Sequence, residues 1–533
     1  MNDVLLKNCL IINEKKEKIV DILISNGIII KISNGITGSS VATIIDCKKR
    51  LVLPGFIDAH THIPGNMLYD YCGINLSNCK TFREYIESIS QYKLHNPSNQ
   101  VVLGFGWSDE IVYKSIEYKN SENIANVIDK IYPHNPVVLY SIDFHSALCN
   151  SCALKLLGIN SNSEAPLNGI FELDKNGQLS GILRGSATKL IEKRDDLFSF
   201  SEEQFEVAFK KYQEQMLSLG ITSVNTFMFI GINEKKAWAV IKKIESKNEL
   251  IININGFVLA EPDDEPKDVL NKYIMMQSLN SDKIRINSVK IYIDGVVENK
   301  TAYLKEPYKD SHDYIGMLLW DKNKLYQLCN ILNNNLIQIH AHAIGDAAVN
   351  TILESIDSVE NKDNVRKSRD VITHIQLIDK KDVKLFQKNR VIACVQPFWI
   401  NYDLNDHSLD YMMLGDRAYE EYPIGSLISD GVILTSSSDC PVTENPLPFI
   451  AIDKAVRRCG KEKASVYDMI DSFTVNSAYQ LKRENEVGKI IEGFKADLIV
   501  ASQDFTHDNN IVRTECVLTV VDGRIVYNKL MED

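Results

Sequence analysis

Histidine pairs two residues apart occur twice in the chain, at His60-Thr-His62 and at His340-Ala-His342. Each pair follows an apolar run that predicts a β-strand, and side chains two residues apart on a strand point to the same face. Two imidazoles on one face can chelate one cation. A single pair of this kind is weak evidence, because histidines also serve as ordinary surface or core residues.

Two further groups that can bind a metal end other apolar runs. His374 closes the run Val-Ile-Thr-His, and Asp439 follows Thr-Ser-Ser-Ser. Each residue alone could be structural. Histidines and a carboxylate that all stand at strand ends of one fold are hard to explain in that way, so together they predict a metal site.

Lys290 stands inside the apolar run Val-Lys-Ile-Tyr-Ile-Asp-Gly, where an uncompensated ammonium group would be costly to bury. Two explanations stay open. In the first, the lysine forms an ion pair, with Asp294 as the nearest candidate. In the second, burial lowers its pKa, and the neutral amine reacts with CO₂ to give a carbamate that binds metal.

The elements that must position these residues alternate between short β-rich runs and helical patterns, which is typical of parallel α/β folds. Eight strand candidates are present, at 51–58, 221–227, 251–257, 286–293, 336–341, 371–373, 391–396 and 432–437. Eight parallel strands with intervening helices predict a (β/α)8 TIM barrel, in which active sites lie at the C-terminal ends of the strands. The candidate ligands stand at those ends.

The segments outside the predicted barrel have their own patterns. Residues 1–54 and 481–533 alternate apolar and polar positions around Asn-Gly and Asp-Gly pairs that suit tight hairpin turns. Neither end has enough strands to bury a face alone. We therefore expect one composite β-sandwich from both termini and a barrel domain over 55–480. The interval of about 63–200 is too long for one crossover and predicts an inserted α/β subdomain, expected to act as a lid.

Composition fits a soluble globular enzyme, with 44% hydrophobic and 24% charged residues. The 71 acidic and 59 basic residues give a net charge of −12, so nucleic acid is not expected as a partner. We expect a cytoplasmic protein without a membrane span, because no secretory signal and no long apolar run occur. Eleven cysteines suit reduced thiols. The lone Cys149-x-x-Cys152 is weak evidence for a redox or metal site.

The motifs taken together resemble the amidohydrolase superfamily, and more narrowly its amidohydrolase-3 branch, which includes YtcJ-like proteins and N-substituted formamide deformylases. The similarity covers nearly the whole chain and rests on LPGFIDAHTH, GFGWSDE, VKIYIDG, HAHAIGDAAV, THIQLI, SSSDCPV and EVGKIIEGFKADLIV. The resemblance implies a divalent metal, usually zinc, as one or two ions, with Lys290 carbamylated when two are bound. The implied ligands are His60, His62, Lys290, His342, His374 and Asp439. His340 is then a deeper barrel residue.

The resemblance also implies contacts with substrate. His145 is expected to face the substrate, with a structural hydrogen-bonding role as the alternative. Trp107 and Asp109 are expected to line the pocket, although an aromatic residue in an inserted domain also suits a core. Related sequences usually carry an acidic residue where this chain has Gly185. This departure leaves the metal chemistry intact and puts in doubt any substrate carried over from the family.

The function expected from these residues is hydrolysis of a C–N bond in a small amide-like substrate by a metal-activated hydroxide, with Asp439 moving the proton. Deamination and lactone or ester hydrolysis are the alternatives on the same site. Known deaminases often place a glutamate shortly after the fifth-strand histidine, where this chain has Ala-Ile-Gly-Asp. A catalytically dead regulatory or scaffold relative is a third alternative. A homodimer is one assembly left open.

Overall fold

The structure is a computed structural model of the whole chain. It describes residues 3–13, 16–38, 41–97, 100–119, 123–142, 144–166, 169–226, 229–359, 368–507 and 510–530. The chain divides into two compact units. The first comprises Met1–His62, Gln213–Phe227 and Lys247–Asp533, and the second comprises Ile63–Tyr212 and Met228–Ser246.

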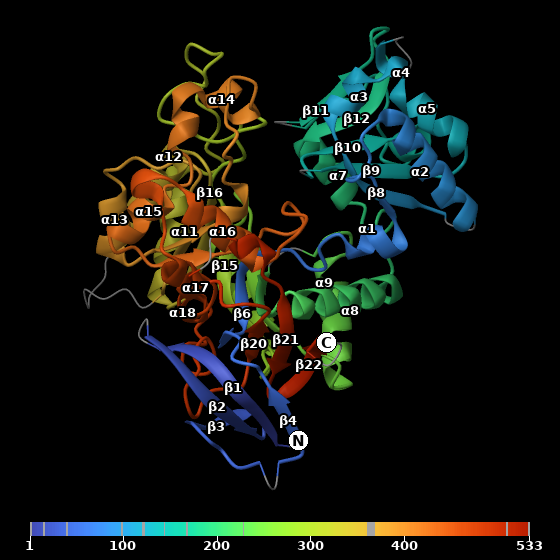
Figure 1. The fold of residues 1–533 in the computed structure, drawn as a ribbon. Helices are drawn as coiled ribbons and strands as arrows, with labels where there is room; N and C mark the ends of the chain where they lie inside the picture. Colours follow the sequence, from blue (N-terminus) through green and yellow to red (C-terminus); the bar gives the residue numbers. More distant parts are fainter. Residues whose placement is uncertain are drawn as a thin grey trace. The chain divides into compact units, whose positions relative to one another are not determined.

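The first unit is built around an eight-stranded sheet whose strands pair in chain order and in parallel (Figure 1). The strands are β6 (Phe56–Thr61), β13 (Ile221–Thr226), β14 (Asn253–Ala260), β15 (Ile284–Tyr292), β16 (Gln338–Ala343), β17 (Val371–His374), β18 (Ile392–Val395) and β19 (Leu434–Ser436). Backbone bonds close the sheet at its ends, because Asp439 N–H donates to the His60 carbonyl and His62 N–H to the Cys440 carbonyl, both at 2.9 Å. The predicted TIM barrel is confirmed.

Helices connect successive barrel strands from β14 onward. They are α10 (Pro266–Met276), α11 (Lys322–Asn334), α12 (Asp346–Asp357), α13 (Val383–Asn389), α14 (Leu409–Leu414), α15 (Ile424–Ser429), α16 (Pro448–Arg457), α17 (Val466–Phe473) and α18 (Val475–Gln480). The last three follow β19. This alternation of strand and helix is the one that the sequence pattern predicts.

One predicted strand is in fact two. The run 51–58 divides at Gly55, so that β5 (Val52–Pro54) joins another sheet while β6 enters the barrel. A Cβ atom at Gly55 would lie 2.3 Å from Thr222 Oγ1, which is closer than a real contact. The backbone therefore passes against its neighbour at a point where only glycine fits. The predicted end of another strand, Phe227, lies outside the described residues.

Strands from both termini form two four-stranded sheets that share one apolar core. The first sheet has the order β3 (Ile28–Ser33), β2 (Lys16–Ser25), β1 (Val4–Asn13), β4 (Thr43–Asp46), and the second has β22 (Arg524–Asn528), β21 (Cys516–Val521), β20 (Leu498–Ala501), β5. Their inner faces meet in one cluster that includes Leu6, Ile22, Ile24, Val500, Leu518 and Val520. The predicted composite sandwich is confirmed.

Two of the three predicted turns form hairpins. Asn26-Gly27 joins β2 to β3, Asp522-Gly523 joins β21 to β22, and all four residues have positive φ. The third pair, Asn34-Gly35, does not start a hairpin, because the next strand, β4, crosses back and pairs in parallel with β1. The terminal segment is thus not a simple meander.

The second unit contains a six-stranded mixed sheet, as predicted for the inserted α/β region. Its order is β11 (Gly169–Leu173), β12 (Leu179–Gly185), β10 (Ser146–Cys149), β9 (Val137–Ser141), β8 (Val102–Trp107), β7 (Ile74–Asn75). Its helices are α1 (Met67–Cys72), α2 (Phe82–His95), α3 (Asp109–Lys114), α4 (Ile116–Lys119), α5 (Ile124–Ile131), α6 (Ser151–Leu156), α7 (Lys189–Glu192) and α9 (Glu234–Ser246).

The helix α8 (Glu202–Ser218) follows this sheet in the chain and begins with a capping box. Gln204 N–H donates to Ser201 Oγ at 3.2 Å, and Ser201 N–H donates to Gln204 Oε1 at 2.9 Å. The two bonds satisfy N–H groups that the first turn of a helix otherwise leaves without partners.

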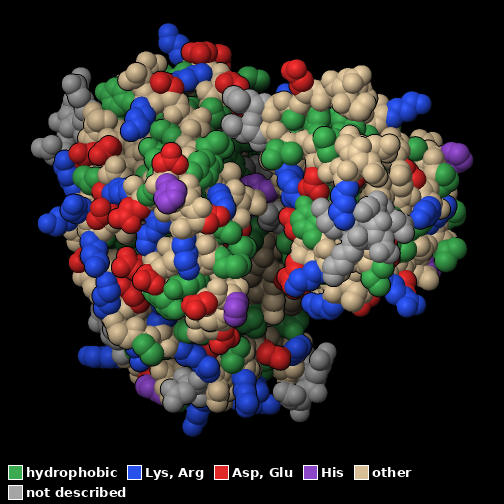
Figure 2. Space-filling view, turned by 90° about the horizontal axis from the view of Figure 1, so that it is seen from above, with side chains coloured by type: hydrophobic (Ala, Val, Ile, Leu, Met, Phe, Trp, Pro, Cys, Tyr) green, Lys and Arg blue, Asp and Glu red, His purple; other side chains and the backbone are tan. Residues whose placement is uncertain are grey.

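The helices and the surface charge bear on where the protein could act. None of the described helices is both long and apolar enough to cross a membrane. Figure 2 shows acidic and basic side chains interspersed over the face in view.

All eleven cysteines are free thiols. In the predicted Cys149-x-x-Cys152 pair, Cys149 is buried on β10 and Cys152 Sγ donates to the Pro133 carbonyl at 3.4 Å.

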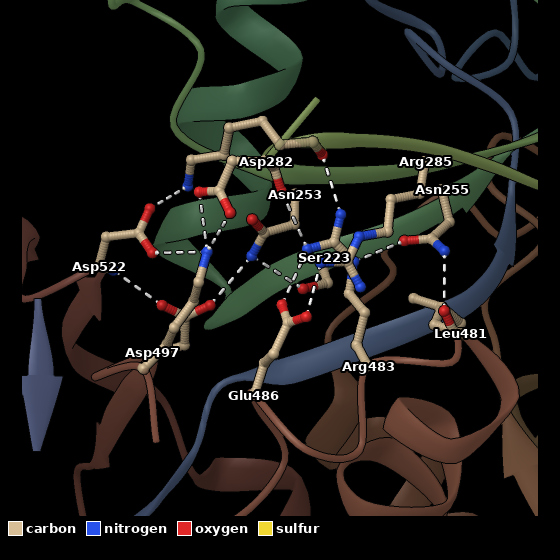
Figure 3. A network of polar contacts seen from close by, with 12 residues as sticks. Ser223, Asn253, Asn255, Asp282, Arg285, Leu481, Arg483, Glu486, Asp497 and Asp522 are labelled. Atoms are coloured by element: carbon tan, nitrogen blue, oxygen red, sulfur yellow. Dashed lines mark hydrogen bonds and ion pairs between the residues drawn. The ribbon is translucent and has the colours of Figure 1, made fainter. Parts of the chain in front are cut away.

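A polar network joins the N-terminal ends of the barrel strands to the segments that follow α18 (Figure 3). Arg483 lies at its centre and is 1% exposed. Its Nε donates to Asn255 Oδ1 at 3.0 Å, and its Nη atoms donate to the carbonyls of Asp282 and Lys283 at 3.3 and 3.2 Å. Burial lowers the pKa of Arg483 to about 10. The guanidinium thus stays charged at neutral pH and ties the barrel to the C-terminal segment.

Asp497 extends the same network to the sandwich. Its Oδ2 accepts a bond of 3.0 Å from Asn253 Nδ2, and its Oδ1 accepts a bond of 2.7 Å from Asp522 N–H. Asn253 Nδ2 also lies 3.2 Å from Ser223 Oγ. Since Asp522 begins the β21–β22 hairpin turn, the carboxylate connects barrel strands directly to that turn.

We expect Arg483→Met to lower the free energy of unfolding by about 3 kcal/mol, because it leaves buried oxygen acceptors without their charged donor. Arg524→Met, at an exposed arginine of the same unit, is the matched control and should change stability little. Thermal melting and urea unfolding of the full chain measure the effect. Equal stability of the two variants would contradict the central role assigned to Arg483.

Candidate metal centre

The six predicted ligands lie in the first unit, at or near the C-terminal ends of barrel strands. His60 is on β6, His62 follows it, Lys290 is on β15, His342 on β16, His374 ends β17, and Asp439 follows β19. All six side chains are buried, with exposed fractions of 0 to 7%. The barrel therefore brings together polar residues that are up to 379 positions apart in the chain.

Three of these residues converge closely enough to hold one ion. The ligand atoms of His60, His374 and Asp439 all lie within 4.8 Å of one another. Asp439 Oδ1 is 3.2 Å from His60 Nε2 and 2.9 Å from His62 Nε2. The ring of His342 is adjacent, with its centroid 4.4 Å from that of His374.

The electrostatics of the cluster favour a bound cation. Burial and the nearby Lys290 lower the pKa of His60 to about 3, and burial likewise lowers the pKa of His342 to about 3. Burial alone would raise the pKa of Asp439, but hydrogen bonds from His60 and His62 outweigh it and hold that pKa well below its usual range. Neutral imidazoles and an ionised carboxylate are the forms that bind metals.

Lys290 is fully buried in the same cluster. Its Nζ lies 3.4 Å from His60 Nε2, and burial lowers its pKa to about 7. The predicted alternative partner, Asp294, accepts backbone bonds of 2.8, 3.0 and 2.9 Å from Tyr303, Ile344 and Gly345. These bonds give Asp294 a structural role in the loops after β15 and β16. Both explanations of Lys290 stay predictions.

Two ligand positions have left-handed backbone. His374 has φ of 79° and Asp439 has φ of 55°, which residues with side chains seldom adopt. Such conformations persist where the surrounding structure fixes them, and they concentrate at functional sites. Here they turn both side chains out of the strand direction at the ends of β17 and β19.

The orientation of His342 follows from a single backbone contact. Its Nε2 lies 3.1 Å from the carbonyl oxygen of Gly295. A carbonyl can only accept, so Nε2 carries the proton and Nδ1 keeps the lone pair. If His342 binds a metal, it does so through Nδ1.

Asp58, which the sequence analysis does not single out, joins the first and last strands beneath the cluster. Its Oδ1 accepts from Ser438 N–H at 2.9 Å and from His60 N–H at 3.3 Å, and its Oδ2 accepts from Ser438 Oγ at 2.5 Å. Burial raises its pKa to about 7. Its position two residues before His60 on one face of β6 is the signal that could have identified it.

Two more residues surround the ligands. His340 is fully buried, and its ring stacks against those of His60 and Phe257, with centroids 4.9 and 4.5 Å away. It lies in register with Lys290 on the next strand. The ring of Trp399 lies parallel to that of His374 at 5.5 Å and is partly exposed. An aromatic residue after β18 gave no distinctive signal in the sequence.

The three predicted substrate contacts lie in the second unit. Trp107 is fully buried in the core of the six-stranded sheet, and its Nε1 donates to the Leu139 carbonyl at 2.7 Å. This placement favours a core role over the predicted contact with substrate. Asp109 forms two bonds with Arg184, of 2.7 and 3.0 Å. His145 is exposed, and its role stays a prediction.

Gly185, where related sequences carry an acidic residue, ends β12 with φ of 55° and ψ of −132°. A side chain would be strained in this conformation. The neighbouring Arg184 already has acidic partners, because Glu172 Oε2 lies 2.9 Å from its Nη2 in addition to Asp109. The local charge is thus balanced without an acid at position 185.

The donor set suits a divalent metal such as zinc. Zinc binds imidazole nitrogen and carboxylate oxygen, and catalytic zinc sites combine three such ligands with one open position. His60, His374 and Asp439 supply these atom types in a buried site.

Comparison with known proteins places these residues in a wider context. A model described as "Amidohydrolase family" matches residues 43–527. The putative amidohydrolase YtcJ of Bacillus subtilis is 26% identical over 511 residues, which cover 92% of each chain. The N-substituted formamide deformylase of Arthrobacter pascens is 21% identical over 514 residues, covering 92% of this chain and 90% of that one.

Solved structures show the same fold. The crystal structure of an uncharacterised metal-dependent hydrolase from Pyrococcus horikoshii OT3 matches with a TM-score of 0.74 at 23% sequence identity, covering 95% of this chain and 99% of that one. A corresponding protein from Pyrococcus furiosus matches with a TM-score of 0.72 at 23% identity, covering 95% and 100%. The predicted family resemblance is confirmed.

We expect His374→Asn to weaken zinc binding by more than about 100-fold, because it removes a ligand outright, whereas loss of a ligand's hydrogen-bond partner typically costs about 10- to 100-fold. His312→Asn, at an exposed histidine of the same unit, is the control and should bind zinc like the parent. Competition with a chromophoric chelator measures the affinity. If both variants bound zinc equally well, His374 would not be a ligand.

Proposed function

Because this chain belongs to the amidohydrolase family and is therefore a hydrolase, we propose that it cleaves a C–N bond of a small amide-type molecule with the help of bound zinc or a similar divalent ion. The observation that carries the proposal is the buried convergence of His60, His374 and Asp439 at the C-terminal end of the barrel. Barrel enzymes have their active sites at this end.

The proposed mechanism assigns one chemical task to the ion and one to Asp439. The ion, when bound, supplies a Lewis acid that polarises the scissile carbonyl and makes water acidic enough to attack near neutral pH. Asp439 takes the proton from the attacking water and passes it to the departing amine nitrogen, which must be protonated to leave. Its low pKa keeps it ionised at neutral pH.

The remaining ligands hold the reaction centre. His60, His62, His342 and His374 are buried and would keep the ion fixed between strand ends. Exclusion of water from this part of the barrel strengthens every electrostatic interaction with the developing charge. The barrel interior thus supports a preorganised site rather than one assembled by substrate.

Lys290 determines whether one ion or two are held. A neutral amine at Nζ can attack CO₂, forming a new N–C bond and releasing a proton, which gives a carbamate anion with two oxygen donors. With a carbamate at this position, Lys290 would supply oxygen donors for divalent ions beside the histidines and Asp439. The buried position of Nζ beside His60 supports this arrangement.

Several features favour amide hydrolysis over the alternatives. Where deaminases often place a glutamate, this chain has Asp346, whose Oδ1 accepts backbone bonds from Lys305 and Ala347 at 2.9 and 3.0 Å and is thus engaged in the loop structure. One relative is named for deformylation of N-substituted formamides, which is hydrolysis of an amide. A dead scaffold relative would have no need for six buried ligands, and its purified form would contain no metal.

The partner we propose is a small amide-like molecule rather than a nucleic acid. The net charge is −12, and Figure 2 shows acidic and basic side chains interspersed over the face in view. Phosphate backbones require clustered lysine and arginine side chains. Location in the cytoplasm and assembly as a homodimer stay predictions.

We expect Asp439→Asn to lower kcat by about 100-fold or more, because proton transfer of this kind contributes about 10²- to 10⁴-fold. The assay measures amine release from a panel of N-formyl and N-acyl amines. Asp430→Asn, an exposed aspartate in the same unit, is the control. Near-normal turnover by the Asp439 variant would show that another group moves the proton.

We expect Lys290→Ala to lose metal and activity together, and acetate or propionate to restore part of both by filling the vacated space with a carboxylate. Lys322→Ala, at an exposed lysine, should lose neither. Elemental analysis and the amine-release assay give the two readouts. An electron-density map with unmodified Lys290 in active, metal-loaded protein would contradict the carbamate.

A further inference from the structure

The imidazole of His374 contacts a buried glutamine on the next barrel strand. Gln396 follows β18 and is fully buried. Its Oε1 lies 3.0 Å from His374 Nδ1. Nδ1 is thus engaged by the glutamine, while the ring's other nitrogen, Nε2, is left for the cluster formed with His60 and Asp439.

The neighbours of Gln396 determine which way its amide faces. Its Nε2 lies 2.7 Å from Ser437 Oγ and 3.3 Å from Thr373 Oγ1. The Ser437 hydroxyl donates its own proton to the Val395 carbonyl at 3.4 Å, so it accepts from the amide nitrogen. With the amide NH₂ group on this side, the carbonyl oxygen Oε1 faces His374.

An oxygen acceptor at Nδ1 fixes the tautomer of His374. Because Oε1 can only accept, Nδ1 carries the proton, and the lone pair is on Nε2. Trp399 restricts the ring further, since its indole lies parallel at 5.5 Å with an interplanar angle of 6° and is itself held by a bond of 3.1 Å from Nε1 to Thr443 Oγ1. Gln396 therefore fixes one edge of the His374 ring, and Trp399 restricts one of its faces.

We propose that Gln396 is a positioning residue that selects Nε2 of His374 as the metal-binding atom, and this inference rests on the metal proposed above. The adjacent ligand has the opposite arrangement, because the Gly295 carbonyl holds the proton on Nε2 of His342 and leaves Nδ1. Two histidines side by side thus present different nitrogens to the ion. An oxygen on a neighbouring segment sets each choice.

The test compares zinc affinities of the full-length protein and three variants by chelator competition. Gln396→Leu removes the acceptor with little change in volume. Gln396→Glu keeps an oxygen that accepts from Nδ1. Gln338→Leu is the matched control, because Gln338 is an equally buried glutamine on β16 whose Nε2 donates to the carbonyls of Arg369 and Gln480 at 2.7 and 3.0 Å, away from the ligands.

Gln396→Leu should bind zinc about 10- to 100-fold more weakly than the parent, which is the usual effect of removing the hydrogen-bond partner of a ligand histidine. Gln396→Glu should stay within about threefold of the parent, because the acceptor is retained. Gln338→Leu should leave affinity unchanged even if it lowers the melting temperature. Equal weakening by all three variants, or none by Gln396→Leu, would overturn the proposal.

A second measurement does not depend on the fold of any Gln396 variant or on bound metal. In the metal-free parent labelled with ¹⁵N-histidine, long-range ¹H–¹⁵N correlation should show His374 protonated at Nδ1, its signals being identified by their loss in His374→Asn. Protonation at Nε2 would overturn the proposal. If the parent itself bound no zinc while the Nδ1 tautomer was present, the proposed function would fail, and only the tautomer that Gln396 sets would stand. Zinc binding that Gln396→Leu left unweakened would instead overturn the positioning role and leave the proposed function intact.

Discussion

The cost of burying charge is the constraint on which this structure depends. Asp439, Lys290 and several histidines are withdrawn from water at the ends of barrel strands, where an unpaired charge is expensive. The protein meets this cost by converging the groups, so that the carboxylate stays ionised between imidazoles that stay neutral. A buried carboxylate beside neutral imidazoles is a donor set that suits a cation.

The two ends of the barrel meet the same constraint in different ways. At the N-terminal end, the charged Arg483 donates to two backbone carbonyls and a side-chain amide and lies 3.9 Å from a carboxylate oxygen of Glu486, which makes that end a stabilising network. At the C-terminal end, His60, His374 and Asp439 converge as the candidate metal site. Stability and chemistry are thus separated along one barrel, as this fold generally allows.

The sequence was sufficient for features that depend on local pattern. Alternation of strands and helices predicted the barrel, and strand-end histidines predicted which side chains converge, because parallel strands fix where their ends meet. It could not show the division at Gly55, which arises from the close approach of Thr222. Nor could it show the partners of the ligands: Gln396 and Asp58 become informative only when strands distant in the chain are neighbours. Trp107 packs in the core of the second unit, and its contact with substrate stays a prediction.

The different nitrogens presented by His342 and His374 have a consequence for isosteric replacement. An asparagine amide extends from the backbone about as far as imidazole Nδ1, and a glutamine amide about as far as Nε2. Asparagine is therefore the closer mimic of His342, whose Nδ1 keeps the lone pair. Glutamine is the closer mimic of His374, whose Nδ1 faces Gln396. Position 342 should thus tolerate asparagine better, and position 374 should tolerate glutamine better. Replacing both histidines by the same amide residue would suit only one of the two positions.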